Sequence, residues 1–271
     1  MPELPEVETT RRGIEPCISG QKIQNVVIRN HALRWPISEE LPHNLIGSTV
    51  LNVNRRAKYL LINVGHGGIL IHLGMSGSLR IVAAETPPKK HDHVDIIFIN
   101  DYALRLHDPR RFGAVLWQPG DLTQHPLLTA LGPEPLLTGF NAQYLHQALR
   151  KRQIAIKPAI MDNHIVVGVG NIYASESLFR AGIHPATIAN KVSLSQCQKV
   201  VDAIKTTLEA ALMAGGSTLR DFVNSDGGSG YFQLQTNVYD RAGQGCKICG
   251  NEIRQIRQGQ RSTFFCPGCQ H

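Results

Sequence analysis

The sequence CKIC at residues 246–249, followed after sixteen residues by CPGC at residues 266–269, organises the C-terminal end of this 271-residue chain. Two Cys-x-x-Cys pairs at this separation match a tetrahedral four-thiolate zinc site, because each pair can chelate the ion from one turn. Four thiolates leave no open coordination position, so the metal is structural. We therefore expect one structural zinc ion, bound by Cys246, Cys249, Cys266 and Cys269.

The segment between the two cysteine pairs is basic. It contains Arg254, Arg257 and Arg261, which only Glu252 opposes. The whole chain has 28 Lys and Arg against 21 Asp and Glu, a formal charge of +7. A basic, metal-stapled hairpin favours nucleic acid as the partner. The alternative is an ordinary solvated hairpin face.

Length and composition describe a globular chain with room for one large or two medium domains. No apolar run approaches the roughly 20 residues that span a bilayer, and the acidic N-terminus does not resemble a signal peptide. We expect a cytoplasmic protein with no membrane partner, and nothing demands more than a monomer. The isolated Cys17 and Cys197 are expected to be small buried hydrophobic side chains.

The first half of the chain is rich in β-strand signals. A short helix is expected over residues 6–14, before Gly13 and Pro16 interrupt the pattern. Short apolar runs separated by turn residues follow and predict eight strands. About eight strands at this spacing favour a β-sandwich or flattened barrel. The strands are expected over residues 23–28, 50–53, 59–64, 69–73, 79–82, 94–99, 103–106 and 114–117.

The second half of the chain has helical periodicity. The stiff Gly132-Pro133-Glu134-Pro135 segment is the expected boundary. Helices are predicted over residues 141–152, from Asn171 as N-cap to before Gly182, and from the cap Ser193 to Gly215. The expected domains are a β-domain over 1–132, a linker over 133–140, a helical domain over 141–235 and a zinc finger over 236–271. Residues 226–230 are expected to form a mobile glycine-rich loop.

The chain starts Met1-Pro2-Glu3-Leu4-Pro5-Glu6. We expect Met1 to be removed, which would leave Pro2 with a secondary amine of pKa near roughly 8. Such an amine can attack an electrophilic carbon, and the resulting iminium is a strong electron sink. Glu3 and Glu6 are close enough in sequence to carry a proton and to position groups. An ordinary frayed terminus is the alternative.

Three other segments have unusual composition. HDPRRFG at residues 107–113 puts two guanidinium groups and Phe112 at a turn, which suits a wedge that enters a base step while Arg110 bonds an unpaired base edge. The alternative is a hairpin tip closed by an Asp-Pro turn. LGMSG at residues 73–77 presents Met75 as a second wedge, or as mere packing. GVGN at residues 168–171 opens a helix where backbone amides could approach a phosphate.

Together, MPELPE at 1–6, HDPRRFG at 107–113, GVGNIYA at 168–174 and the four-cysteine finger resemble the formamidopyrimidine-DNA glycosylase family. The resemblance implies an α+β fold: an N-terminal helix with a β-sandwich, then a helix–two-turn–helix domain with a C-terminal zinc-finger β-hairpin. It also implies a DNA glycosylase and AP lyase that excises 8-oxoguanine and formamidopyrimidines from damaged double-stranded DNA in base excision repair. An N-terminal proline Schiff base and β,δ-elimination are its chemistry, with no redox cofactor.

The same resemblance assigns roles to individual residues. The catalytic residues are Pro2 as nucleophile, Glu3 as proton carrier, Glu6 in support, and Lys58 near the lesion phosphate. The expected DNA-binding residues are Met75, His93, Arg110, Phe112, Lys157, Asn171 and Arg261. The segment from Ser217 to Tyr231 matches a flexible cover over the everted base. The family also implies an enzyme that acts at the bacterial nucleoid.

Two alternatives are open at this stage. An endonuclease VIII-like enzyme would act on oxidised pyrimidines, but its opening has glycine where this chain has Leu4. A non-catalytic zinc-ribbon protein would explain the charge and the finger, but not Pro2 with two nearby glutamates.

Overall fold

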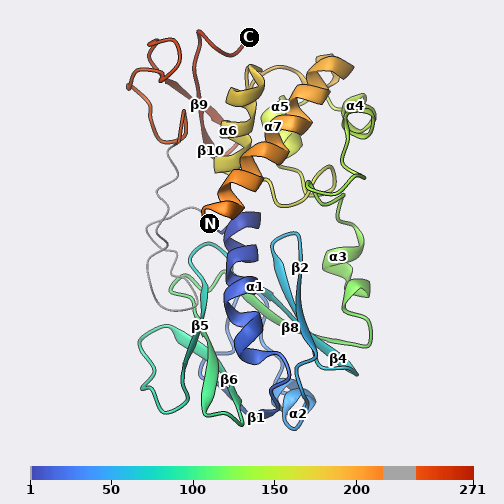
Figure 1. Ribbon diagram of the computed structural model, residues 1–271, viewed down its shortest axis with the longest axis vertical. Helices are drawn as coiled ribbons and strands as arrows, with labels where there is room; N and C mark the ends of the chain where they lie inside the picture. Colours follow the sequence, from blue (N-terminus) through green and yellow to red (C-terminus); the bar gives the residue numbers. More distant parts are fainter. Residues whose placement is uncertain (1, 216–235) are drawn as a thin grey trace. The chain divides into compact units, whose positions relative to one another are not determined.

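The computed structural model describes residues 2–215 and 236–271 (Figure 1). The chain divides into two compact units, the first ending at Thr129 and the second starting at Ala130. The second unit also includes the C-terminal residues from 236 onward. The predicted mobile loop at 226–230 and the expected cover from Ser217 to Tyr231 lie outside the described residues. No helix in the described ranges is both long and apolar enough to cross a bilayer.

Helix α1 (Leu4–Ile18) begins the first unit and is longer than predicted. It continues through Gly13 and Pro16, so the prediction that these residues end the helix was wrong. Pro16 has no N–H to donate to the Arg12 carbonyl, so the last turn of α1 forgoes one backbone hydrogen bond. The apolar face of α1 is buried, which offsets that loss. Cys17 is exposed, contrary to expectation, while Cys197 is buried as predicted.

Two four-stranded antiparallel sheets, ordered β1-β6-β7-β5 and β2-β3-β4-β8, complete this unit and confirm the predicted β-sandwich. Both sheets and α1 contribute to one hydrophobic core, and α1 contacts β2, β3 and β5 (Figure 1). The strands are β1 (Ile23–Ile28), β2 (Asn52–Arg56), β3 (Tyr59–Asn63), β4 (Gly67–His72), β5 (Ser78–Ala83), β6 (Asp92–Phe98), β7 (Tyr102–His107) and β8 (Ala114–Pro119). Two short helices, α2 (Leu41–Leu45) and α3 (Pro126–Thr129), were not predicted.

Strand β4 starts at Gly67, two residues before the strand predicted over residues 69–73. A Cβ on Gly68 would lie 2.2 Å from the carbonyl oxygen of Ile62 on β3. Glycine at this position therefore lets β3 and β4 approach closely, and Gly67 and Gly68 belong to the sheet.

The second unit contains α4 (Ala142–Leu149), α5 (Ile156–Ile160), α6 (Asn171–Ala181) and α7 (Leu194–Met213). The side chain of Asn141, predicted as the first residue of this helix, caps α4 instead by accepting from the Tyr144 amide at 2.9 Å. Ser193 accepts from the Gln196 amide at 3.2 Å, as predicted for a cap. The N-cap of α6 is Gly170, so the prediction of Asn171 as the cap was wrong. The Asn171 side chain instead bonds to the finger and to Lys157.

Residues 133–140, which we expected to form a linker, pack against this unit. The Val167 amide donates to the Pro133 carbonyl at 3.2 Å, and Phe140 is fully buried in the helical core. The finger hairpin consists of β9 (Arg254–Gln258) and β10 (Arg261–Phe265). Phe264 of this hairpin shares a small core with Phe179 of α6, so the finger packs on the helical unit.

Candidate active site and nucleic-acid interface

The four predicted zinc ligands converge at one point. Their sulfur atoms all lie within 4.8 Å of one another, and they are the metal-binding group found in the described part of the chain. The pKa of Cys246 falls to about 7, because backbone N–H groups of Cys249 and Ile248 stabilise the thiolate against the opposing effect of burial. Burial and the neighbouring sulfurs of Cys249 and Cys266 raise the pKa of Cys269. Crowded thiolates of this kind need a cation, and the site holds one structural zinc ion.

Glycine makes the tight geometry of the finger possible. Gly250 has φ +78°, a conformation that side chains disfavour. A Cβ on Gly268 would lie 3.1 Å from the sulfur of Cys249. Both glycines therefore allow the sulfur atoms to converge.

Lys157 connects the helical unit to the finger. Its Nζ donates to Asn171 Oδ1 at 2.7 Å, to Thr263 Oγ1 at 2.9 Å and to the carbonyl of Ser262 at 3.1 Å. The Asn171 amide also donates to that carbonyl at 3.1 Å. Lys157 is only 1% exposed, so its ammonium group is directed at protein acceptors.

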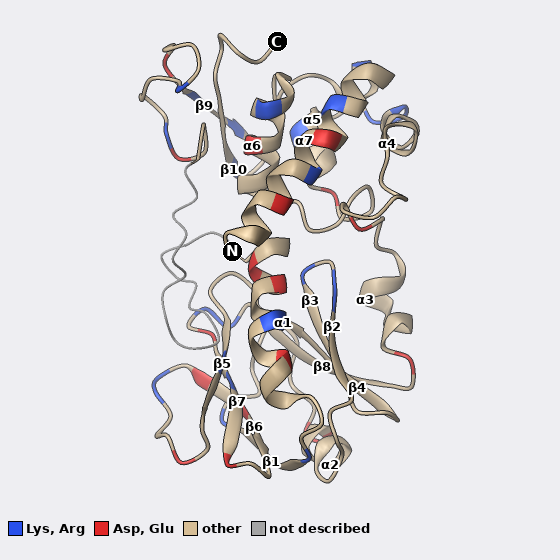
Figure 2. Cartoon of the chain, in the orientation of Figure 1, with Lys and Arg blue, Asp and Glu red and all other residues tan. Residues whose placement is uncertain are grey.

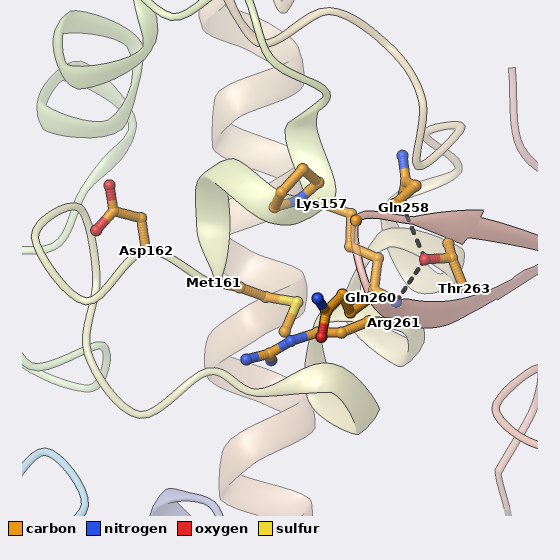
Figure 3. Close-up of a pocket in the computed structure, with 9 residues that line it drawn as sticks. Lys157, Met161, Asp162, Gln258, Gln260, Arg261 and Thr263 are labelled. Carbon is orange, nitrogen blue, oxygen red and sulfur yellow. Dashed lines mark hydrogen bonds between the residues drawn. The ribbon is translucent and has the colours of Figure 1, made fainter.

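A pocket of about 290 Å³ lies beside this lysine (Figure 3). It is lined by residues of α5 and by the turn between β9 and β10, including the exposed Arg261. The fold thus brings three residues predicted to bind DNA, Lys157, Asn171 and Arg261, into one part of the second unit. Figure 2 shows Lys and Arg on this hairpin and also on β2 of the first unit and in the turn that leads to β3.

The start of α1 is a buried acidic site. Glu3 is 2% exposed and Glu6 is fully buried. The Glu3 amide donates to Glu6 Oε2 at 2.8 Å as part of a capping box. This bond fixes the backbone directly after Pro2, which is itself buried. Glu6 therefore orients the first residues of the chain.

Lys58 lies in the turn from β2 to β3 and is 8% exposed. A residue that the sequence did not single out, His72 at the end of β4, lies within its electrostatic reach. Burial, followed by the charges of Lys58 and Arg34, lowers the pKa of His72 to about 4. The neutral ring accepts from the Gly74 amide at 3.0 Å through Nδ1. In the sequence, the only feature that could have drawn attention to His72 is its position directly before the LGMSG segment.

The two predicted wedge loops lie against each other. Met75 is 37% and Phe112 is 42% exposed. The guanidinium carbon of Arg110 lies 4.9 Å from the Phe112 ring centroid. Gly74 has φ +63°, and a Cβ on it would lie 2.4 Å from the carbonyl carbon of Phe112. The two loops can therefore pack together only with glycine at position 74.

His93 contacts the backbone at the start of the HDPRRFG loop. It is 6% exposed, and its Nε2 is 2.9 Å from the carbonyl oxygen of Asp108. The neighbouring His91 is more exposed, has φ +76° and makes ring contacts with His93 and His107. His91 is thus the more accessible of the two histidines. Nothing in the sequence favoured His91 over His93 as the DNA-binding residue.

Comparison with known proteins agrees with this architecture. Family models match residues 1–115 (Formamidopyrimidine-DNA glycosylase N-terminal domain), 131–223 (Formamidopyrimidine-DNA glycosylase H2TH domain) and 243–271 (Zinc finger found in FPG and IleRS). A helix on a β-sandwich, a helical H2TH domain and a four-cysteine hairpin define a zinc-finger DNA glycosylase. The chain belongs to the formamidopyrimidine-DNA glycosylase family.

Relatives and solved structures cover the whole chain. The formamidopyrimidine-DNA glycosylases of Thioalkalivibrio sulfidiphilus and Paraburkholderia phytofirmans are 54% and 56% identical to it, each with 100% of both chains covered. A Lactococcus lactis FPG mutant in complex with DNA containing Fapy-dG is 36% identical with a TM-score of 0.93, covering 100% of both chains. The Thermus thermophilus MutM (FPG) protein is 36% identical with a TM-score of 0.88, covering 99% of this chain and 98% of that one. Membership of this family excludes the non-catalytic zinc-ribbon alternative and disfavours the endonuclease VIII-like one.

Proposed function

We propose that this chain excises oxidised purines from duplex DNA and then cuts the strand at the abasic site, with Pro2 as the nucleophile. The observation that supports this most directly is the buried Glu3–Glu6 pair, which holds the backbone next to Pro2. A secondary amine beside a buried carboxyl group is suited to nucleophilic attack coupled to proton transfer.

In the proposed reaction the Pro2 nitrogen bonds to C1′ of the damaged nucleotide, and the bond from C1′ to the base breaks. The base leaves with the electron pair, and the proton that the Pro2 nitrogen loses after attack is transferred to it. Glu3 protonates the ring oxygen of the sugar, so the ring opens and an iminium forms. The iminium acidifies the C2′ hydrogens, and successive β- and δ-elimination release the two phosphates. Water then frees Pro2.

The remaining predicted residues bind and deform the DNA. Lys58 and Arg261 neutralise phosphates and Asn171 donates a hydrogen bond to one, while Met75, Arg110 and Phe112 fill the space that the extruded base leaves. His93 and Lys157 are buried, so we propose that they act through the groups they bond. We propose that the half-buried His91, which is more accessible than His93, supplies an imidazole near the DNA. We further propose that the protein acts as a cytoplasmic monomer on nucleoid DNA.

Borohydride trapping tests this function. The purified chain, incubated with a duplex containing 8-oxoguanine, should yield a covalent protein–DNA adduct. Pro2→Gly should lose most of the adduct, and Glu3→Gln should excise the base about 100-fold or more slowly, the typical contribution of a proton-transfer group. Glu39→Gln, an exposed glutamate of the same unit, is the control and should behave like the unmodified chain.

Two further measurements complete the test. Mass spectrometry should show that Met1 has been removed, because a retained methionine makes the Pro2 nitrogen an unreactive amide. Duplexes with thymine glycol should be cut more slowly than those with 8-oxoguanine. The absence of any adduct, or an active chain that retains Met1, contradicts the proposed chemistry.

A further inference from the structure

Asp108, at the start of the HDPRRFG wedge loop, has a fully buried carboxylate that contacts both proposed wedge loops. Its Oδ1 accepts a hydrogen bond from the Ser76 hydroxyl at 3.1 Å, and Ser76 directly follows Met75. Its Oδ2 accepts from the Gly113 amide at 2.8 Å, and Gly113 directly follows Phe112. One carboxylate thus uses one oxygen for each loop.

The backbone of Asp108 is fixed as well. Its amide donates to the His91 carbonyl at 3.0 Å, and its carbonyl oxygen lies 2.9 Å from Nε2 of His93 and accepts from the Arg111 amide at 3.2 Å. These hydrogen bonds hold the backbone of Asp108 in place directly after strand β7. Any movement of one loop away from the other must break a hydrogen bond to a buried charge, which is among the costlier bonds to lose.

We propose that Asp108 is a positioning residue that couples the two loops, so that Met75 and Phe112 enter the DNA as one preformed unit. This inference rests on the proposed function of the two loops as wedges. Asp108 does not need to touch DNA or to transfer a proton. Its contribution is to keep two exposed apolar side chains at a fixed separation before the DNA arrives, which lowers the entropy cost of insertion.

Three substitutions test whether Asp108 acts through its two hydrogen bonds or through its negative charge. Asp108→Ala removes both bonds. Asp108→Asn can keep both, because its oxygen can accept from Gly113 while its amide donates to the Ser76 hydroxyl, which can rotate. Ser76→Ala removes one bond only and leaves the Gly113 bond in place, so it also serves if Asp108→Ala does not fold.

Two DNA substrates separate wedge insertion from the covalent step. Excision of 8-oxoguanine from a duplex requires the base to be extruded, whereas borohydride trapping on a single-stranded abasic oligonucleotide does not. Asp108→Ala should slow duplex excision by roughly 10-fold or more, the equivalent of one hydrogen bond to a charged group. Trapping on the single strand should stay unchanged. Ser76→Ala should have an intermediate effect, and Asp108→Asn should recover most of the duplex rate.

A fluorescent 2-aminopurine beside the lesion reports insertion directly, and its signal should rise more slowly with Asp108→Ala. The matched control is Asp121→Ala, because the Asp121 carboxylate also accepts from one backbone amide and one hydroxyl, both of Thr123, at 2.9 and 2.8 Å. Asp121 is exposed and outside the wedge loops, so its substitution should leave insertion unchanged.

The inference is overturned if Asp108→Ala slows both reactions equally, or if Asp108→Asn is as slow as Asp108→Ala. An unchanged duplex rate in both Asp108→Ala and Ser76→Ala also overturns it. Failure of the proposed function appears differently, because the unmodified chain would then form no adduct with either substrate.

Discussion

The ammonium nitrogen of Lys157 lies 2.7 Å from Oδ1 of Asn171, at the first residue of helix α6. The same nitrogen bonds to Ser262 and Thr263 of the finger. One buried cation therefore sets the position of the Asn171 side chain relative to strand β10. The proposed binding of phosphates by Asn171 and Arg261 depends on this relationship.

Substituting Lys157→Met should destabilise the second unit. The change leaves three acceptors, of which Thr263 Oγ1 belongs to a buried residue, without their charged donor, and we expect the free energy of unfolding to fall by about 3 kcal/mol. Urea denaturation measures this loss. Lys199→Met, at an exposed position on α7, is the matched control and should change stability little. Equal stability of the two variants would show that Lys157 contributes no net energy.

Removal of zinc should unfold the finger, because its small core depends on the cluster of cysteines. Structural zinc contributes on the order of 10 kcal/mol to the folding of such sites. Cys249→Ser should therefore bind less zinc and lose most DNA affinity, as measured by metal analysis and by a binding titration. Cys17→Ser changes an exposed thiol on α1, so it should keep one zinc per chain. Loss of zinc without loss of DNA binding would contradict the role of the finger.

Arg261→Ala should weaken DNA binding for all sequences alike. One lost phosphate contact should reduce the slope of log K against log salt by about one unit. Titrations at several salt concentrations give this slope. Arg180→Ala, an exposed position of α6, is the control and should retain the full slope. If the two variants have equal slopes, Arg261 makes no phosphate contact.

His72 should make the first unit sensitive to acid. Its pKa falls from 6.5 to about 4 on folding, so between these values the unfolded chain binds the proton and the folded chain does not. Stability therefore decreases as pH falls through this window, and the contribution of His72 is constant above about pH 6.5. Between pH 7 and pH 5 the loss should be about 2 kcal/mol.

The variant His72→Gln tests this directly, because glutamine can still accept from Gly74 but cannot titrate. Its loss of stability from pH 7 to pH 5, measured by denaturation at each pH, should be about 2 kcal/mol smaller than that of the unmodified chain. The control His43→Gln, at an exposed position, should show the same acid sensitivity as the unmodified chain. An unchanged sensitivity in His72→Gln would show that its burial does not oppose protonation.

Local sequence was sufficient wherever the relevant interactions lie within a few residues of one another. The two cysteine pairs chelate from single turns, short apolar runs and turn residues predicted the β-sandwich, and Ser193 caps its helix from the adjacent position. These features depend on backbone geometry and short-range hydrogen bonds, so the order of residues is enough to predict them. The candidate residues Pro2, Glu3 and Glu6 are likewise neighbours in the chain.

Tertiary structure alone decided the features that depend on burial and on distant partners. Helix α1 continues through Pro16 because its apolar face is covered, and Asn171 bonds to the finger 91 residues away instead of capping its own helix. Asp108 meets Ser76 across 32 residues, and Lys157 meets Thr263 across 106. The exposure of His91, the burial of His93 and the low pKa of His72 follow from packing in the same way. A linear pattern does not encode these effects, because desolvation and hydrogen bonding depend on which surfaces the folded chain brings together.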